Sequence, residues 1–327
     1  MESRRLGNSG LRVSPIAIGS WLTFGEAVDQ TATRELVAQA IDLGVCFFDT
    51  ADVYANGDAE AALGAALRSS DRQRVVIGTK CYFPTSEAPN DRGLSRKHLF
   101  QSVENSLRRL DTDYLDLHQC HRYDTDAPLE ETVRAYEDLI HQGKLLYWGT
   151  SLWTAKQISA ACDVADRTGG FRPVSNQPAY SILRREIEGK LLPGCRELGV
   201  HQVVFSPLAQ GVLTGKYSGG QAPEGSRGSD PRLGRFMQRY LTPETLERVD
   251  ALAPIAAELG VPLATFALAW CLRDPSVSSV ITAATHVRQL EQNCDAGRIV
   301  IPEELAQRVD ALFPPATTAL PPDPDTP

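Results

Sequence analysis

The sequence has no long apolar stretch and no excess of positive charge. No apolar run reaches the roughly 20 residues needed to cross a bilayer, and the start MESRRLGNSG lacks the apolar centre of a secretion signal. The formal net charge of the 327 residues is −8, which disfavours nucleic acid and acidic membrane surfaces as partners. We therefore expect a cytoplasmic protein without membrane insertion and without a nucleic-acid partner.

Paired cysteine motifs are also missing. The seven cysteines are dispersed, none lies in a C-x-x-C pair, and several lie inside apolar runs. An odd, scattered set of this kind indicates reduced, buried thiols and argues against a disulfide framework or a zinc site. No metal is therefore expected. The segment 314–327 is rich in Pro and Asp, has little to bury, and is expected to be a disordered tail.

Apolar runs that are typical of buried strands alternate with segments of helical periodicity over most of the chain. We count eight strand-then-helix units, which predict parallel pairing with right-handed crossovers. Eight units fit an α/β fold of the (β/α)8 TIM barrel type, typically about 250 residues, with the extra length in loops and a C-terminal extra helix. An N-terminal hairpin turned at Asn8-Ser9-Gly10 is expected to plug the barrel bottom. No linker divides the chain, so residues 1–313 are expected to form a single barrel domain.

The alternative fold is an open, doubly wound sheet. That fold binds the diphosphate of a dinucleotide with a G-x-G-x-x-G turn after its first strand. No such turn follows the first expected strand, SPIAIG, which favours the barrel.

Caps and breakers set the expected bounds of the helices. Ser95 opens one helix, and Thr154 with Gln157 forms a capping box before another. The stretch 206–241 is rich in Gly and Pro and is expected to be irregular. One helix is expected to run from Pro243 to Leu259.

Four polar residues lie where buried strands are expected to end or just beyond: Asp49, Tyr54, Lys80 and His121. The carboxyl ends of neighbouring strands share one face of a barrel, so these side chains are expected to meet there. A free tyrosine has a pKa near 10, and a neighbouring lysine ammonium lowers it. We expect a carboxylate to hold that lysine charged and a histidine to orient a carbonyl oxygen. Such a site can protonate a developing alkoxide while another group supplies hydride.

Each of these residues also has a plainer interpretation. A single Asp, Tyr, Lys or His at a strand end is more often a capping or surface residue than a catalyst. Asp52 could replace Asp49 as the carboxylate. His118 precedes His121 by an odd number of positions in one strand, so it should face elsewhere. Lys80 could instead be the Schiff-base lysine of an aldolase. The joint placement of four suitable residues favours the proton-transfer site.

The chain resembles the aldo-keto reductases from about Arg5 to Phe313. The segments that carry the resemblance are LGNSGLRVSPIAIGSWLTFG, FFDTADVYANGDAE, RGLSRKHL, ETVRAYEDLIHQGKLLYWGTSLW, FSPLAQGVLTGKY and LAWCLRDPSVSSVI. It is strongest for the branch that contains the β subunits of voltage-gated potassium channels and their bacterial relatives. The resemblance implies a (β/α)8 barrel, NADP(H)-dependent carbonyl reduction without metal, and a catalytic tetrad at the four residues already singled out.

The resemblance also implies where NADP(H) and the substrate would bind. Ser151 and Gln177 match the pair that bonds the nicotinamide carboxamide, and Phe205 matches the ring that stacks on the nicotinamide. Lys216 and Arg227 match the loop over the diphosphate. The residues expected to bind the cofactor are Gly19, Ser20, Trp21, Asp49, Ser151, Leu152, Gln177, Phe205, Ser206, Pro207, Leu208, Ala209, Gln210, Gly211, Lys216, Arg227, Ala283, Thr285, Gln289, Gln292 and Asn293. Those expected to bind the substrate are Trp21, Tyr54, Tyr82 and His121, with Phe83, Arg122 and Tyr240 as further candidates for the pocket wall.

The last cofactor segment, TAATHVRQLEQN, departs from the family pattern. Ala283, Thr285 and Gln292 stand where the family often has Gly, Ser and Glu. We expect Thr285, Gln289 and Asn293 still to contact the adenosine phosphate and the adenine. The resemblance therefore favours NADPH over NADH.

Two classes of function remain open. The first is an oxidoreductase of aldehydes, with ketones as further candidates, acting as a general aldehyde or methylglyoxal reductase or as a nucleotide-sugar reductase. The second is a channel-type β subunit that uses bound NADP(H) as a redox sensor. Channel β subunits have Asn where this chain has His121, which favours the first class and a small-molecule carbonyl substrate. The resemblance also allows a homo-oligomer, because relatives in this branch assemble as tetramers or octamers.

Overall fold

We describe residues 1–230 and 234–315 in a computed structural model of the chain. Apart from Pro314 and Pro315, the predicted disordered tail lies outside these residues.

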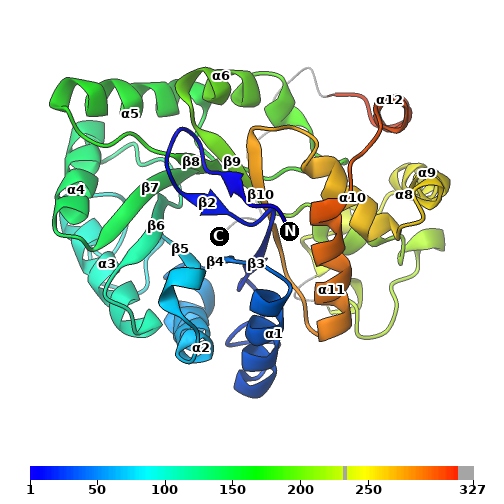
Figure 1. Cartoon of the computed structure of the whole chain (residues 1–327), viewed down its shortest axis with the longest axis horizontal. Helices are drawn as coiled ribbons and strands as arrows, with labels where there is room; N and C mark the ends of the chain where they lie inside the picture. Colours follow the sequence, from blue (N-terminus) through cyan, green and yellow to red (C-terminus); the bar gives the residue numbers. More distant parts are fainter. Residues whose placement is uncertain (231–233, 316–327) are drawn as a thin grey trace.

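Eight parallel strands close into a barrel at the centre of the molecule (Figure 1). In chain order they are β3 (Ile16–Gly19), β4 (Phe47–Asp49), β5 (Val76–Cys81), β6 (Leu115–Cys120), β7 (Leu145–Ser151), β8 (Ser175–Gln177), β9 (His201–Val204) and β10 (Val277–Thr282). Consecutive strands are neighbours, and β10 pairs with β3, Val280 opposite Ile16. The predicted (β/α)8 barrel is therefore confirmed, and the open doubly wound sheet is wrong.

Helices surround the barrel (Figure 1). They are α1 (Gln30–Asp42), α2 (Asp58–Leu67), α3 (Arg96–Leu110), α4 (Leu129–His141), α5 (Ala155–Thr168), α6 (Leu191–Leu198), α8 (Pro243–Asp250), α9 (Ala253–Glu258), α10 (Leu263–Cys271), α11 (Val287–Asp295) and α12 (Glu303–Leu312). The predicted caps form: Ser95 accepts a bond from the His98 amide at the start of α3, and Thr154 with Gln157 makes the capping box of α5. The extra C-terminal helix is α12.

The single helix expected from Pro243 to Leu259 is wrong, because α8 ends at Asp250 and α9 begins at Ala253. Pro254 explains the break. A proline inside a helix has no N–H to donate, and its ring collides with the carbonyl four residues earlier, here that of Asp250.

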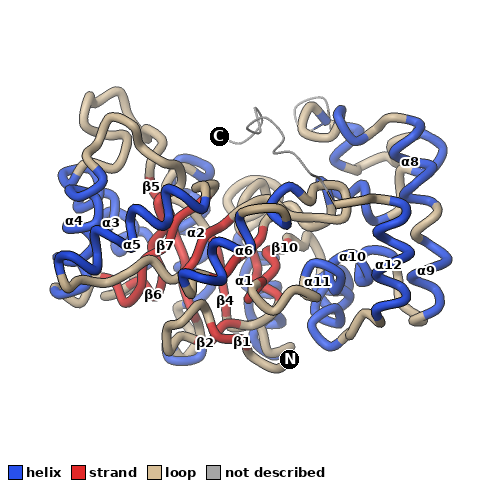
Figure 2. Tube along the Cα trace, turned by 90° about the horizontal axis from the view of Figure 1, so that it is seen from above, coloured by secondary structure: helices blue, strands red, loops and turns tan. Residues whose placement is uncertain are grey.

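The N-terminal hairpin closes one end of the barrel, as predicted. Its strands are β1 (Arg4–Arg5) and β2 (Arg12–Val13). Leu6 and Val13 are fully buried and pack on the barrel interior with Phe47. Figure 2 shows β1 and β2 at one end of the strands. The loops that follow the carboxyl ends of the strands are therefore left for a site at the opposite end.

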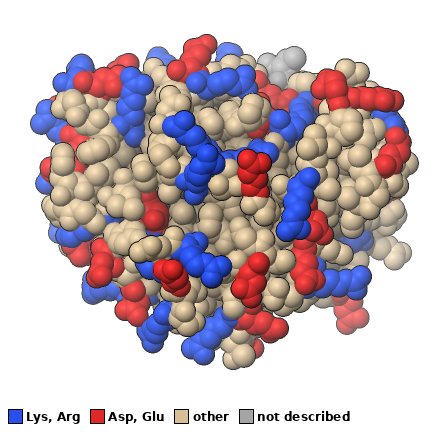
Figure 3. Space-filling view, in the orientation of Figure 1, with Lys and Arg blue, Asp and Glu red and all other residues tan. Residues whose placement is uncertain are grey.

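The cysteines form no disulfide among the described residues. All seven cysteines are unpaired, and six of them are buried. No single described helix is long and apolar enough to cross a membrane; α8–α9 and α10 meet that test only jointly, across a bend of 88°. On the face seen in Figure 3, acidic and basic side chains are interspersed.

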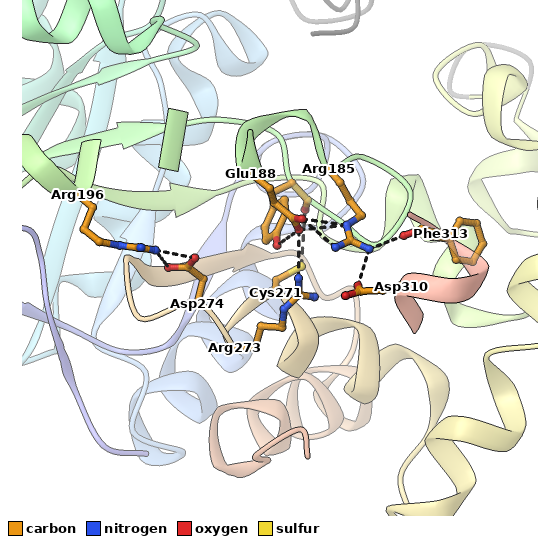
Figure 4. Close-up of polar contacts among 9 residues, drawn as sticks. Arg185, Glu188, Arg196, Cys271, Arg273, Asp274, Asp310 and Phe313 are labelled. Atoms are coloured by element: carbon orange, nitrogen blue, oxygen red, sulfur yellow. Dashed lines mark hydrogen bonds and ion pairs between the residues drawn. The ribbon is translucent and has the colours of Figure 1, made fainter. Parts of the chain in front are cut away.

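A buried arginine ties the C-terminal helix to the barrel loops (Figure 4). Arg185 is 3% exposed and pairs with Glu188 at 2.8 Å and with Asp310 of α12 at 2.7 Å. It also donates to the carbonyl of Phe313, directly after α12. Its guanidinium carbon lies 4.9 Å from the ring centroid of Trp270 in α10.

We predict that Arg185→Met destabilises the fold strongly, because it removes a buried guanidinium that bonds to Glu188, to Asp310 and to the Phe313 carbonyl. Each charge-assisted hydrogen bond that is lost typically costs about 1.5–3 kcal/mol in free energy of unfolding. Arg196 is the matched control: it pairs with Asp274 at 3.0 Å but its side chain is 56% exposed. Arg196→Met is expected to cost at most about 1 kcal/mol. Equal midpoints for the two variants in urea unfolding would contradict this account.

Candidate active site

The four residues predicted to form a tetrad come together at the carboxyl ends of β4, β5 and β6. Asp49 is the last residue of β4, Lys80 is the penultimate residue of β5, and His121 directly follows β6. Tyr54 begins a short 3-10 helix, Tyr54–Gly57, between β4 and α2. Since β4, β5 and β6 are adjacent, register alone brings three of the side chains to one edge.

Lys80 and Asp49 form a buried ion pair at the floor of the site. The Lys80 Nζ lies 2.7 Å from the Asp49 Oδ2 and donates to the Thr50 carbonyl at 2.7 Å. Its third neighbour is the Tyr54 hydroxyl at 3.5 Å. Lys80 is 0% exposed and Asp49 3%, so water does not screen the pair.

Tyr54 and His121 lie edge to face, with ring centroids 5.7 Å apart. The Nδ1 of His121 is buried and has no hydrogen-bond partner within the described part of the chain. A buried nitrogen without a partner is costly unless a ligand or water satisfies it. This ring therefore has capacity for a polar ligand beside the tyrosine hydroxyl.

The pKa values of the tetrad residues differ from the prediction at one residue, Tyr54. Burial raises the pKa of Tyr54, and the Lys80 charge offsets that rise only in part, so the predicted net lowering is wrong. Burial opposes the charge of Lys80, but Asp49 and Tyr54 together outweigh it, so the Lys80 pKa is raised. Burial, with Lys80 and Arg122, lowers the pKa of His121 well below its usual range. At neutral pH the site therefore holds a phenol, an ammonium and a neutral imidazole.

Strand β8 completes the floor. The Gln177 Nε2 donates to the other carboxylate oxygen of Asp49, Oδ1, at 2.9 Å. Ser151, at the end of β7, donates through its hydroxyl to the Gln177 carbonyl at 3.0 Å. Asp49 is thus held on both oxygens, which fixes the orientation of the carboxylate that pairs with Lys80.

The two plainer alternatives lie outside the barrel. Asp52 accepts a bond from Ser102 of α3 at 2.8 Å and makes no contact with Lys80 through its side chain. The Nδ1 of His118 lies 2.9 Å from the Tyr136 hydroxyl of α4. Strand alternation therefore separates His118 from His121, and Asp49 is the carboxylate of the site.

A cavity of about 830 Å³ opens above these residues. Asp49, Tyr54 and His121 line it, whereas Lys80 lies beneath them and does not. Cavities of this size hold small organic ligands and cofactors.

Most of the residues expected to bind the cofactor also line the cavity: Gly19, Trp21, Asp49, Ser151, Gln177, Phe205, Ser206, Pro207, Leu208, Gln210, Gly211, Lys216, Arg227, Ala283, Thr285 and Gln289. Those that do not are Ser20, Leu152, Ala209, Gln292 and Asn293. The hydroxyl of Ser20 donates to that of Thr50 at 2.8 Å, and Asn293 is 3% exposed and donates to the Ala283 carbonyl. Of the substrate candidates, four line the cavity, namely Trp21, Tyr54, His121 and Arg122, and three do not, namely Tyr82, Phe83 and Tyr240.

Part of the cavity wall could not be predicted from the sequence. Phe236 packs edge to face on Trp21 at 5.5 Å, and Ser226, Asp230 and Arg239 also line the cavity. These residues lie in the irregular stretch 206–241, where no periodicity indicates which side chains face inward. The hydroxyl of Ser226 is buried without a hydrogen-bond partner among the described residues.

Strained backbone is concentrated in the loops around the cavity. Of the eight described non-glycine residues with positive φ, all but Asp111 lie in these loops: Leu22, Ala55, Asn56, Leu152, Ser206, Ala209 and Gln210. Such conformations cost of order 1 kcal/mol or more each and persist where surrounding contacts impose them. The turn after Tyr54 contains two of them, Ala55 and Asn56, followed by Gly57 at φ 96°.

Sequence comparison identifies the class of protein. The model of the aldo/keto reductase family matches residues 15–313. A protein of Oryza sativa subsp. japonica named as a probable voltage-gated potassium channel subunit beta is 44% identical over 317 residues, which cover 95% of this chain and 96% of the relative. An Arabidopsis thaliana protein of the same name is 44% identical over 303 residues, 92% of each chain. This chain therefore belongs to the aldo/keto reductase family, as its motifs predict.

Two further buried carboxyl groups, those of Asp52 and Glu60, lie on either side of the turn that follows Tyr54. Asp52 and Glu60 are 1% and 0% exposed, and Arg109 of α3 donates to Glu60 at 2.6 Å. Burial and the Glu60 charge raise the pKa of Asp52 from 3.8 to about 7, against the bond from Ser102 and the charge of Arg109.

We predict that Asp52→Asn stabilises the fold at alkaline pH. A carboxyl whose pKa is raised on folding favours the native state below its unfolded pKa, and that advantage is lost as pH rises through the native pKa. The benefit of Asn should therefore grow between about pH 4 and about pH 7 and approach roughly 4 kcal/mol above that window. Urea unfolding of both proteins across this range measures it. A difference that does not change with pH would contradict the assigned shift.

Proposed function

We propose that this protein is an NADPH-dependent oxidoreductase that reduces aldehydes to alcohols, with Tyr54 as the general acid. The observation that carries the proposal is the buried Asp49–Lys80–Tyr54 contact at the floor of a cavity that His121 also lines. Membership of the aldo/keto reductase family supports oxidoreductase chemistry. The seven unpaired cysteines fit a reducing, cytoplasmic location.

In the proposed reaction the Tyr54 hydroxyl gives its proton to the carbonyl oxygen of the substrate. The phenolate that forms would stand beside the Lys80 ammonium, at the 3.5 Å now seen between the two groups. Asp49 keeps Lys80 protonated, so the positive charge is in place before the reaction begins. Neutral His121 would donate a hydrogen bond that orients the carbonyl oxygen. The bound cofactor would supply the hydride.

The cavity wall fits NADPH. Lys216 and Arg227 place two positive charges on it. The Ser226 hydroxyl, which has no hydrogen-bond partner in the described part of the chain, adds a donor for a phosphate oxygen. In doubly wound folds, an NADH site uses a carboxylate to bind the ribose 2′-hydroxyl. In the last cofactor segment the residues that line the cavity are Thr282, Ala283, Thr285 and Gln289, and none is acidic.

The aldolase alternative is less well supported. A lysine that forms a Schiff base attacks as the neutral amine. Lys80 is paired with Asp49, has a raised pKa, and is not on the cavity wall.

The second candidate function is a channel-type β subunit that uses bound NADP(H) as a redox sensor. The names of the relatives from rice and Arabidopsis favour it. This candidate binds NADP(H) as well, so turnover of an aldehyde, and not cofactor binding, distinguishes it from the first. A nucleotide-sugar reductase would share the catalytic residues and differ in its substrate.

We predict that Tyr54→Phe lowers kcat for a nitrobenzaldehyde by on the order of 10²–10⁴. Phenylalanine keeps the ring and its packing on His121 but has no proton to give. NADPH affinity, measured by fluorescence titration, should stay within about twofold. Wild-type kcat in this variant would remove Tyr54 from the mechanism. Borohydride treatment with the aldehyde alone is the control, because a covalent adduct on Lys80 found by mass spectrometry would establish the aldolase alternative instead.

We also predict that Lys216→Met and Arg227→Met each weaken NADPH binding. A charge-assisted bond to a phosphate is worth roughly 1.5–3 kcal/mol, or about 10- to 150-fold in Kd. The KM for the aldehyde at saturating NADPH should change little. Arg235, which is exposed and not on the cavity wall, is the matched control for loss of one positive charge. Unchanged NADPH affinity in both variants would show that this loop does not cover the phosphates.

A further inference from the structure

A buried hydrogen-bonded network packs behind the turn that follows Tyr54. Glu60, in the first turn of α2, is 0% exposed. Its Oε1 accepts a hydrogen bond from the Thr79 hydroxyl at 2.5 Å, and its Oε2 accepts one from the Arg109 Nε at 2.6 Å. Within the described part of the chain, no residue of this Arg109–Glu60–Thr79 network lines the cavity. The network therefore lies behind the reacting groups and does not touch a ligand in the cavity.

Arg109 also packs directly against the turn. A Cβ on Gly57, the last residue of the turn, would lie 2.9 Å from the Arg109 Cδ and 3.1 Å from its Nε, which leaves no room for a larger residue. Ala55 and Asn56, directly before Gly57, have positive φ angles of 47° and 53°. Backbone of this kind persists where surrounding contacts impose it. Arg109 supplies such a contact, and its bond to Glu60 fixes the position of its guanidinium.

The network reaches the strand that carries Lys80. Thr79 directly precedes Lys80 in β5, and alternation along a strand turns the two side chains to opposite faces. Lys80 bonds to the Tyr54 hydroxyl inside the barrel, and Thr79 bonds to Glu60 outside it. Before the turn, the Asp52 amide donates to the Lys80 carbonyl at 3.1 Å. The chain is thus joined to β5 on both sides of Tyr54.

We propose that Arg109 and Glu60 are positioning residues, which hold the Tyr54 hydroxyl where it can protonate the substrate and meet the Lys80 ammonium. The inference rests on the proposed reductase function and extends it to residues outside the cavity. Neither residue touches the reacting atoms, so both act through Tyr54. A catalytic group that is misplaced by about 1 Å can lose on the order of 10² in rate. Loss of the network should therefore lower kcat and leave the binding of aldehyde and NADPH unchanged.

Glu60→Gln and Arg109→Met remove the charge of one partner each. In the full-length protein at saturating NADPH, each should lower kcat for a nitrobenzaldehyde by about 10- to 100-fold. The KM for the aldehyde and the Kd for NADPH should stay within about twofold, because neither residue lines the cavity. Arg109→Lys keeps a positive charge that can pair with Glu60, and it should recover part of kcat.

Arg72 is the matched control for the loss of an ion pair. Its pair with Asp116 has the same 2.6 Å distance, with side chains 25% and 8% exposed, against 27% and 0% for Arg109 and Glu60. Arg72 precedes β5 and Asp116 lies near the start of β6, so this pair is at the end of the strands away from the cavity. Arg72→Met should lower the urea midpoint at least as far as Arg109→Met, because Arg72 also donates to two backbone carbonyls. It should leave kcat unchanged.

A double variant shows whether the network acts through Tyr54. If it does, Arg109→Met should not slow the residual rate of Tyr54→Phe any further, although it slows the wild-type protein. A measurement that needs no turnover is the ¹³C resonance of the Tyr54 ring in protein labelled at tyrosine, identified by its absence from Tyr54→Phe. That resonance should shift in Arg109→Met and in Glu60→Gln, and keep its wild-type position in Arg72→Met.

Several results would overturn the proposal. The first is wild-type kcat in both Arg109→Met and Glu60→Gln. The second is equal slowing by Arg109→Met with and without the Tyr54 hydroxyl, because the network would then act by another route. The third is an equal loss of kcat in Arg72→Met, which would assign the effect to stability. If the wild-type protein reduces no aldehyde, the proposed function is wrong, and an unmoved Tyr54 resonance in Arg109→Met would show separately that the network does not position the ring.

Discussion

The ion pair between Lys80 and Asp49 is the interaction on which the rest of the site depends. Both groups are out of water, so each carries a desolvation cost that only its partner and the bonds from Gln177 and to the Thr50 carbonyl offset. Either charge without its partner would destabilise the folded protein in this position. The pair keeps a positive charge permanently beside the Tyr54 hydroxyl, where the proposed reaction creates a negative one.

The register of the barrel strands brings Asp49 and Lys80 together. The loops that surround the cavity, by contrast, contain strained backbone. Asp49 and Lys80 lie on adjacent parallel strands, so their meeting requires no flexible segment. Tyr54, by contrast, depends on a turn with Ala55 and Asn56 in left-handed conformations. Packing holds that turn: a Cβ on Gly57 would come within 2.9 Å of the Arg109 side chain, which in turn pairs with Glu60.

The parts of the molecule with a regular period could be predicted from the sequence, and the parts without one could not. Alternation of strands and helices gave the barrel, and the end of each strand gave Asp49, Lys80 and His121. Pro254 is a local signal for the break between α8 and α9, but the helical periodicity of residues 243–259 favoured a single helix. The inward-facing residues of 206–241, such as Phe236, follow no period. The net pKa direction of Tyr54 was predicted wrongly, because a motif shows the neighbouring charge of Lys80 but not the degree of burial.

The most direct measurement is a single turnover with deuterated cofactor. Wild-type protein and Lys80→Met would each be loaded with NADPH carrying deuterium at the transferable C4 position and mixed with a nitrobenzaldehyde. We predict deuterium on the carbinol carbon of the alcohol from wild-type protein, and transfer slower by on the order of 10² or more in Lys80→Met with cofactor still bound. Equal transfer rates in the two proteins, or alcohol without deuterium, would contradict the account.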